Sequence, residues 1–229
     1  MSEIPVIELR DVTHSYGSGP SVLSRATLAL SQGGFYVLQG PSGAGKTTLL
    51  RLMNRLEEPS SGEILYRGKP LNRYSPPELR RKVLYVHQTP AALDASVRDN
   101  LLLPFGFHAN RGLKPPDDRR LEKMLEDFML EGVALKDNAL NLSVGQLQRV
   151  CFLRGLLLGP DALLLDEPVS ALDAASAEVL ESRLEEVNRD LGVTVVMISH
   201  RSFVPRHVQP VAVNVSGGEV REVPWNRPS

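Results

Sequence analysis

The segment GPSGAGKT, residues 40–47, carries the strongest chemical signal in the chain. It matches the phosphate-loop pattern G-x-x-x-x-G-K-[ST] at every position. Glycines let such a loop wrap a phosphate so that successive backbone N–H groups point inward. Lys46 can then reach the β and γ phosphates, and the Thr47 hydroxyl can hold Mg²⁺. The segment predicts a nucleoside triphosphate site; the simpler alternative is a glycine-rich turn that only ends a strand.

Two adjacent carboxylates end the apolar run ALLLDEP, residues 162–168. Such a run is typical of a buried strand that brings acids to the carboxyl edge of a parallel sheet, where ligands bind. Asp166 would then contribute to the Mg²⁺ shell. Glu167 points differently, one residue later, and could accept a proton from an attacking water. The alternative is a polar strand exit without a chemical role.

A third segment, LSVGQ at residues 142–146, precedes a helical pattern. Ser143 suits a helix N-cap, because its side-chain oxygen can accept a bond from a backbone N–H of the first turn. Free N–H groups and the helix dipole make such a start a ready anion site. These residues leave open which anion is held and to which chain it belongs.

Strands and helices must position these segments. Apolar patterns predict strands or hairpins at 6–16, 21–30, 34–40, 61–71, 82–88, 162–168, 193–200 and 211–220. Helical spacing predicts helices at 46–56, 118–130, 142–158 and 176–191. In the second of these helices the stripe of Leu121, Met124, Leu125 and Phe128 is expected to be core. Strands alternating with helices imply a mostly parallel sheet covered on both faces, hence an α/β fold.

The composition excludes several classes of protein. A formal charge of −1, from 26 basic and 27 acidic residues, argues against a broad nucleic-acid surface. The one cysteine, Cys151, excludes an internal disulfide and fits a reducing compartment. The N-terminus lacks the pattern of a signal peptide, and no run of about 18 apolar residues could span a membrane. We therefore expect a cytoplasmic domain that binds no nucleic acid.

The motifs GPSGAGKT, LSVGQ and LLLDEP, in that order, closely resemble the nucleotide-binding subunit of ABC transporters. The resemblance covers essentially the whole chain. It implies a single ABC ATPase domain over residues 1–229, built as a phosphate-loop NTPase core with an N-terminal antiparallel β subdomain. It also implies an inserted helical subdomain at approximately 89–156. The expected ATP-binding residues of the loop are Gly40, Pro41, Ser42, Gly43, Ala44, Gly45, Lys46, Thr47 and Thr48.

Other family motifs imply roles for single residues. Tyr16 would stack on adenine, and Gln88 would reach Mg²⁺ and the attacking water. His200 would contact the γ-phosphate and position the water that Glu167 polarises. Each has a simpler alternative: a strand aromatic for Tyr16, a strand-end polar group for Gln88 and a core histidine for His200.

In the resemblance, LSVGQ is the family signature, which caps the γ-phosphate of ATP bound to a second subunit. Two chains, head to tail, would trap two ATP molecules. The residues acting across the dimer would be Ser143, Val144, Gly145 and Gln146, with Asp173 in a loop that crosses between subunits. Val144 departs from the family, where Gly is usual, at a modest helix-propensity cost. Gly155 stands where Ala is usual and is expected to soften its helix slightly.

The resemblance implies an ATPase that energises a multi-spanning membrane permease from the inner face of the membrane. The permease would dock around Gln88 and residues 89–105. Residues 88–105 most resemble the FetA-like branch, associated with metal export or metal tolerance, although importer ATPases look similar over the motifs. Two alternatives stay open: regulation of a non-transporting membrane complex, and a soluble ABC ATPase acting on nucleic acid or translation. A single cassette without a heptad run disfavours the latter.

Overall fold

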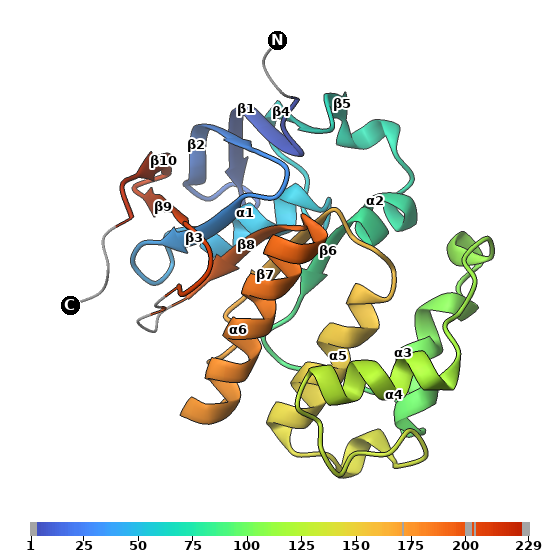
Figure 1. Cartoon of the computed structure of the whole chain (residues 1–229). Helices are drawn as coiled ribbons and strands as arrows, with labels where there is room; N and C mark the ends of the chain where they lie inside the picture. The colour runs from blue at the N-terminus through green and yellow to red at the C-terminus, as the bar shows by residue number, and fades with distance from the viewer. Residues whose placement is uncertain (1–3, 171, 200–202, 204, 226–229) are drawn as a thin grey trace.

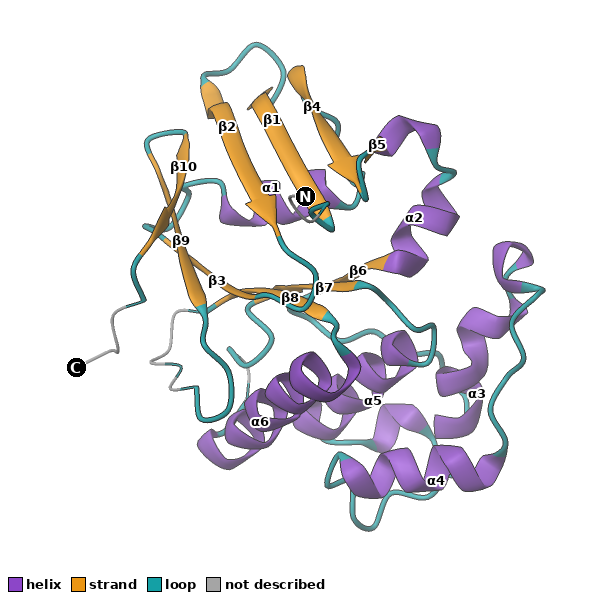
Figure 2. Cartoon of the chain, turned by 45° about the horizontal axis from the view of Figure 1, so that its top comes forward, coloured by secondary structure: helices purple, strands orange, loops and turns teal. Residues whose placement is uncertain are grey.

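The computed structural model describes residues 4–170, 172–199, 203 and 205–225. Two β-sheets enclose a short helix, and a layer of helices covers the outer face of the larger sheet (Figures 1 and 2). The predicted α/β fold class, with its N-terminal antiparallel sheet and mostly parallel second sheet, is confirmed.

The larger sheet has six strands in the order β10-β9-β3-β8-β7-β6. Their bounds are Phe35–Gln39 (β3), Val83–Val86 (β6), Ala162–Asp166 (β7), Thr194–Ile198 (β8), Val211–Ser216 (β9) and Glu219–Val223 (β10). Neighbours from β9 to β6 run parallel, and β10 adds an antiparallel edge. Every residue of β7 and β8 is buried. Cover on both faces explains why these strands are continuous apolar runs in the sequence.

The smaller sheet is antiparallel, in the order β2-β1-β4-β5. Its strands are Ile7–Ser15 (β1), Ser21–Leu30 (β2), Ser61–Tyr66 (β4) and Lys69–Pro70 (β5). Helix α1, Lys46–Met53, lies between the two sheets (Figure 2). It contributes four fully buried side chains to the core there, Leu49, Leu50, Leu52 and Met53. The residues that follow the phosphate loop are therefore held on both sides.

The other face of the larger sheet is covered by helices (Figure 2). These are α3 (Val97–Leu102), α4 (Asp118–Asp127), α5 (Val144–Leu156) and α6 (Ala174–Leu191); a further helix, α2 (Pro76–Lys82), leads into β6. Short 3₁₀ turns occur at Leu71–Arg73, Leu103–Gly106, His108–Asn110 and Ala139–Asn141. The predicted core stripe of α4 is confirmed, because Leu121, Leu125 and Phe128 are buried and Met124 packs against the same cluster. None of the helices in the described residues is long and apolar enough to cross a membrane.

Gly155 has a packing role beyond the slight softening of α5 expected from the sequence. A Cβ atom at this position would lie 2.2 Å from Cδ2 of Leu84 on β6. Leu84 thus occupies the space that an alanine side chain would need. The glycine lets the helix that starts at the signature pack closely on the edge strand of the sheet.

Candidate nucleotide-binding site

The phosphate loop joins β3 to α1, and its glycines have the backbone that only glycine adopts readily. Gly40, Gly43 and Gly45 have φ values of 141°, 77° and 97°. A Cβ atom on Gly40 would also lie 2.0 Å from the carbonyl oxygen of Val215. Gly45 is the N-cap of α1 and provides no side-chain cap. The first N–H groups of α1 therefore lack a side-chain acceptor at the N-cap and can bind an anion.

Lys46 adds a buried cation to this loop. The residue is 7% exposed, and its Nζ donates to the carbonyl oxygens of Gly40, at 2.8 Å, and Pro41, at 2.9 Å. Within the described part of the chain, no carboxylate forms an ion pair with it. A buried ammonium bonded to neutral oxygens alone is poorly compensated. A phosphate in the loop would supply the missing negative charge.

Two of the three predicted Mg²⁺ ligands, Thr47 and Asp166, meet next to this lysine. Thr47 Oγ1 donates to Oδ1 of Asp166 at 3.1 Å, joining the start of α1 to the end of β7. Asp166 is 8% exposed. Hydroxyl and carboxylate oxygens are the hard donors that Mg²⁺ prefers. The residues present therefore fit the predicted metal, with a buried carboxylate aimed at the phosphate loop.

A tyrosine that no motif indicated completes the surroundings of this carboxylate. Tyr85 on β6 donates its hydroxyl to Oδ2 of Asp166 at 2.6 Å. Burial, followed by the hydrogen bond to Asp166, raises the pKa of Tyr85 to about 12. The phenol therefore stays protonated at neutral pH and can donate a hydrogen bond. Each oxygen of Asp166 thus accepts one hydrogen bond from a hydroxyl group, Oδ1 from Thr47 and Oδ2 from Tyr85.

Glu167 has an unusual backbone for its residue type. Its φ of 50° lies in the left-handed region that non-glycine residues rarely occupy. Such conformations cost about 1–3 kcal/mol and cluster at functional sites. The turn directs Glu167 away from Asp166 and towards Gln88, whose Nε2 donates to Glu167 Oε2 at 3.3 Å. A serine that the sequence analysis missed, Ser170, also binds Gln88 Nε2, at 3.0 Å.

Tyr16 stands at the edge of the site. The residue is 47% exposed, and its hydroxyl hydrogen-bonds to Thr48 Oγ1 of α1 at 3.0 Å. Its ring meets the buried ring of His14 edge to face, with centroids 4.8 Å apart. An aromatic face anchored next to the phosphate loop is compatible with the adenine platform predicted for Tyr16.

The signature segment has the predicted cap. Ser143 Oγ accepts from Gln146 N at 3.2 Å, and Gln146 Oε1 accepts from Ser143 N at 2.9 Å, which completes a capping box at the start of α5. Val144 is 54% exposed there. A Cβ atom on Gly145 would lie 3.2 Å from Ser176 Oγ, so the segment packs against the start of α6.

Asp173 caps α6 and binds this same serine. Its carboxylate accepts from Ser176 N at 2.9 Å and from Ser176 Oγ at 2.7 Å. These hydrogen bonds lower the pKa of Asp173. Ser176 thus lies between the carboxylate of Asp173 and the backbone of the signature segment.

The structure keeps the signature apart from its own phosphate loop. Helices α5 and α1 lie on opposite faces of the larger sheet (Figure 2). Among the described residues, no hydrogen bond or ion pair joins 143–146 to 40–48. His200, predicted to contact the γ-phosphate, lies outside the described residues, and its role stays a prediction.

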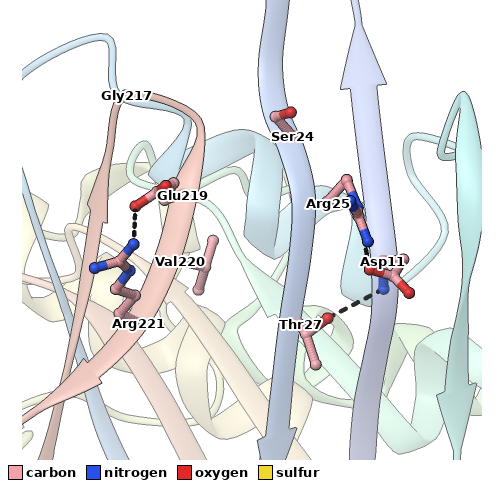
Figure 3. A pocket seen from close by; sticks show the side chains of 8 residues that line it. All are labelled: Asp11, Ser24, Arg25, Thr27, Gly217, Glu219, Val220 and Arg221. Carbon is pink, nitrogen blue, oxygen red and sulfur yellow. Dashed lines mark hydrogen bonds and ion pairs between the residues drawn. The ribbon is translucent and has the colours of Figure 1, made fainter.

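A polar hollow of about 470 Å³ lies away from these residues, between β2 and β10 (Figure 3). Its charges are already paired: Arg25 with Asp11 at 3.5 Å, and Arg221 with Glu219 at 2.7 Å. None of the predicted site residues lines it. The candidate site is therefore the cluster around Lys46, and not this hollow.

Comparison with known proteins agrees with this geometry. Residues 23–170 match the ABC transporter family. The chain is 38% identical over 224 residues to the methionine import ATP-binding protein MetN 3 of Pseudomonas fluorescens, covering 95% of this chain and 67% of that protein. It is 31% identical over 219 residues to the probable iron export ATP-binding protein FetA of Escherichia coli, covering 95% of each.

A solved structure has the same fold. The ATP-binding cassette MJ0796, in a dimeric post-hydrolysis state bound to ADP and Pi, superimposes with a TM-score of 0.81 and 30% identity. The match covers 96% of this chain and 99% of that one. The chain thus belongs to the ABC transporter family, as an ATP-binding domain that hydrolyses ATP.

Proposed function

We propose that this chain energises a membrane transporter by hydrolysing Mg²⁺-bound ATP between two head-to-tail subunits. One observation carries the nucleotide part of the proposal: Asp166 bonds to Thr47 at the start of α1, while the adjacent buried Lys46 bonds only to carbonyl oxygens and forms no ion pair in the described residues. We likewise propose that residues 1–229 form a single ABC ATPase domain, with a helical subdomain at approximately 89–156.

The residues of the site divide the reaction between them. The loop N–H groups and Lys46 bind the phosphates, and Tyr16 stacks on adenine. Bound Mg²⁺, held by Thr47, Gln88 and Asp166, would neutralise charge on the β and γ phosphates. A water oxygen attacks the γ-phosphorus, its proton passes to Glu167, and the bond to the β–γ bridging oxygen breaks to release ADP.

The second subunit supplies the rest of the site. In this proposal Ser143, Val144, Gly145 and Gln146 contact the γ-phosphate of the partner's ATP, with Asp173 at the same interface. The exposed start of α5 and its separation from the chain's own phosphate loop support this arrangement. The dimeric state of the similar cassette MJ0796 supports it as well.

An apolar groove at the end of β6 is the proposed permease dock. It has a volume of about 250 Å³ and is lined by Leu84, Pro90, Pro104, Phe107, Cys151 and Leu158, among others. Phe107 is 53% exposed. His87 and Thr89, which flank Gln88, also line the groove. A cytoplasmic helix of a permease bound here would place the chain on the inner face of the membrane and would lie next to the Gln88–Glu167 contact.

Relatives of comparable identity include a methionine import protein and a probable iron export protein. The identity to FetA agrees with the resemblance of residues 88–105 to the FetA-like branch. The ATPase cycle is the function that these relatives share, and the proposal rests on it.

Two substitutions test the proposed chemistry. Lys46→Ala should lose most ATP affinity and all hydrolysis, because the loop loses its cation. Glu167→Gln should keep ATP binding but slow hydrolysis by about 10²–10⁴-fold, the usual contribution of a general base. Titration with labelled ATP and a phosphate-release assay separate the two effects. Glu126→Gln, an exposed position on α4, serves as the matched control. Near-normal turnover in Glu167→Gln would disprove the assigned base.

A further inference from the structure

Tyr85 lies beside the proposed metal site but belongs to none of the sequence motifs. Its hydroxyl donates to Oδ2 of Asp166 at 2.6 Å, while Thr47 donates to the other oxygen, Oδ1, at 3.1 Å. We propose that Tyr85 is a positioning residue, which orients the Asp166 carboxylate for Mg²⁺. This inference rests on the proposed function and adds a residue to it.

The pairing of β6 with β7 brings the Tyr85 side chain within reach of Asp166. β6 and β7 are parallel neighbours, and Tyr85 pairs with Leu164, two residues before Asp166. The side chains of Tyr85 and Asp166 lie on the α1 side of the sheet: Tyr85 packs against the core cluster there, and Asp166 bonds to Thr47 of α1. A side chain shorter than tyrosine would end before the carboxylate. Phenylalanine would fill the same space without a donor for Oδ2.

The bond matters because the carboxylate is nearly buried and could otherwise turn. The terminal torsion of an aspartate is broad, so packing alone defines its plane weakly. With Tyr85 bound to Oδ2, the oxygen that faces Thr47 is Oδ1. Residues that hold a metal ligand in place in this way typically contribute about 10–100-fold to metal affinity.

Arg51 extends the arrangement into α1. Its guanidinium lies near the Tyr85 hydroxyl and near Asp166, and these groups raise the pKa of Arg51. The ordered chain of side chains is Arg51, Tyr85, Asp166 and Thr47, which begins and ends on α1. A phenol between a cation and a carboxylate is polarised towards the carboxylate, which strengthens its hydrogen bond. All four residues lie on a helix or a strand, which fixes the positions of their backbones.

The test compares Tyr85→Phe with a matched control, Tyr74→Phe. Tyr74→Phe also removes one hydrogen bond, which the Tyr74 hydroxyl donates to the Tyr66 carbonyl oxygen at 3.1 Å, but Tyr74 lies away from the proposed site. Two readouts are used: the Mg²⁺ midpoint of ATP hydrolysis, and Mn²⁺ binding in the presence of ADP, followed by electron paramagnetic resonance. We expect Tyr85→Phe to raise both metal midpoints about tenfold. Nucleotide affinity in EDTA and the melting temperature should match those of the control.

The outcomes separate this inference from the proposed function. Wild-type protein that binds no ATP, or hydrolyses it without Mg²⁺, would contradict the proposed function itself. A wild type that needs Mg²⁺, together with unshifted metal midpoints in Tyr85→Phe, would overturn the positioning role alone. If Tyr85→Phe lost nucleotide affinity equally with and without metal, the positioning role would also be overturned, because the loss would indicate a structural role. If Tyr85→Phe does not fold, Tyr85→Met replaces it, because a flexible methionine fills irregular space and has no donor for Oδ2. Unshifted metal midpoints in that variant would overturn the inference.

Discussion

Gly155 allows a direct test of how closely the signature helix packs on the sheet. A Cβ atom there would lie 2.2 Å from Cδ2 of Leu84 and 3.4 Å from its Cγ. In a free helix interior, Gly→Ala stabilises by about 1 kcal/mol. Here the new methyl group forces Leu84 out of its rotamer, and such overpacking costs about 1–3 kcal/mol. We expect Gly155→Ala to lower the free energy of unfolding by about 1 kcal/mol, the net of the two effects.

The sign of this effect should reverse in a Leu84→Ala background. There the methyl group added at Gly155 meets open space, so the same substitution should stabilise by about 1 kcal/mol. The two positions are then coupled by about 2 kcal/mol, well above the scatter of about 0.3–0.5 kcal/mol seen for independent sites. Urea unfolding of the wild type, both single variants and the double variant measures this coupling.

One result would refute the packing argument. If Gly155→Ala raised the stability of the wild type by the ordinary propensity gain, Leu84 could not be filling that space. Thermal melts give a second reading, since about 1 kcal/mol shifts the midpoint by about 2–4 °C in a chain of this size. Coupling near zero would have the same meaning, whatever the sign of the single variants.

Other predictions concern Asp161, which directly precedes β7, and the signature segment. Asp161 is partly buried, which raises its pKa, but hydrogen bonds from Tyr66, Arg67 and Lys82 outweigh this effect and lower the pKa. Asp161→Asn should therefore cost about 1.5–3 kcal/mol at neutral pH. The difference in stability between wild type and Asp161→Asn should narrow as the pH falls below the ordinary carboxylate pKa of about 4, because Asp161 then becomes protonated. Urea midpoints that differ equally at neutral pH and below about pH 4 would contradict this prediction. Ser143→Arg should abolish ATP-dependent dimerisation and hydrolysis but keep binding of labelled ATP; loss of that binding would refute a role across the dimer. Val144→Gly should leave hydrolysis unchanged or raise it, and a large loss in a phosphate-release assay would show that Val144 makes a needed contact.

The sequence predicted features that depend on residues close together in the chain. The phosphate loop from Gly40 to Gly45 could be predicted because each of its glycines stands where the backbone needs a positive φ. The N-cap at Ser143 was predicted for the same reason; the reciprocal bond from Gln146 was not predicted, although it lies only three residues away. Buried strands such as β7 are readable as continuous apolar runs. Local geometry and burial were enough in all of these cases.

Contacts between distant segments could be predicted only where a family motif pointed to them. Thr47 and Asp166 were both predicted to hold Mg²⁺, so their proximity was expected, although their direct hydrogen bond was not predicted. The Tyr85–Asp166 bond was not expected, because an aromatic in a buried strand normally indicates packing alone. His14, which supports Tyr16, carried no pattern for the same reason. The positive φ of Glu167 was also hidden, since it arises from the turn at the strand end and not from residue type.

The central claim is that two chains trap ATP between a phosphate loop and a partner's signature. The most direct test is the mass of Glu167→Gln in solution, by size-exclusion chromatography with light scattering. We predict the mass of one chain without nucleotide and twice that mass with Mg²⁺ and ATP, because uncleaved γ-phosphates add contacts across the interface. A protein that binds ATP under these conditions yet keeps the mass of one chain would contradict the claim.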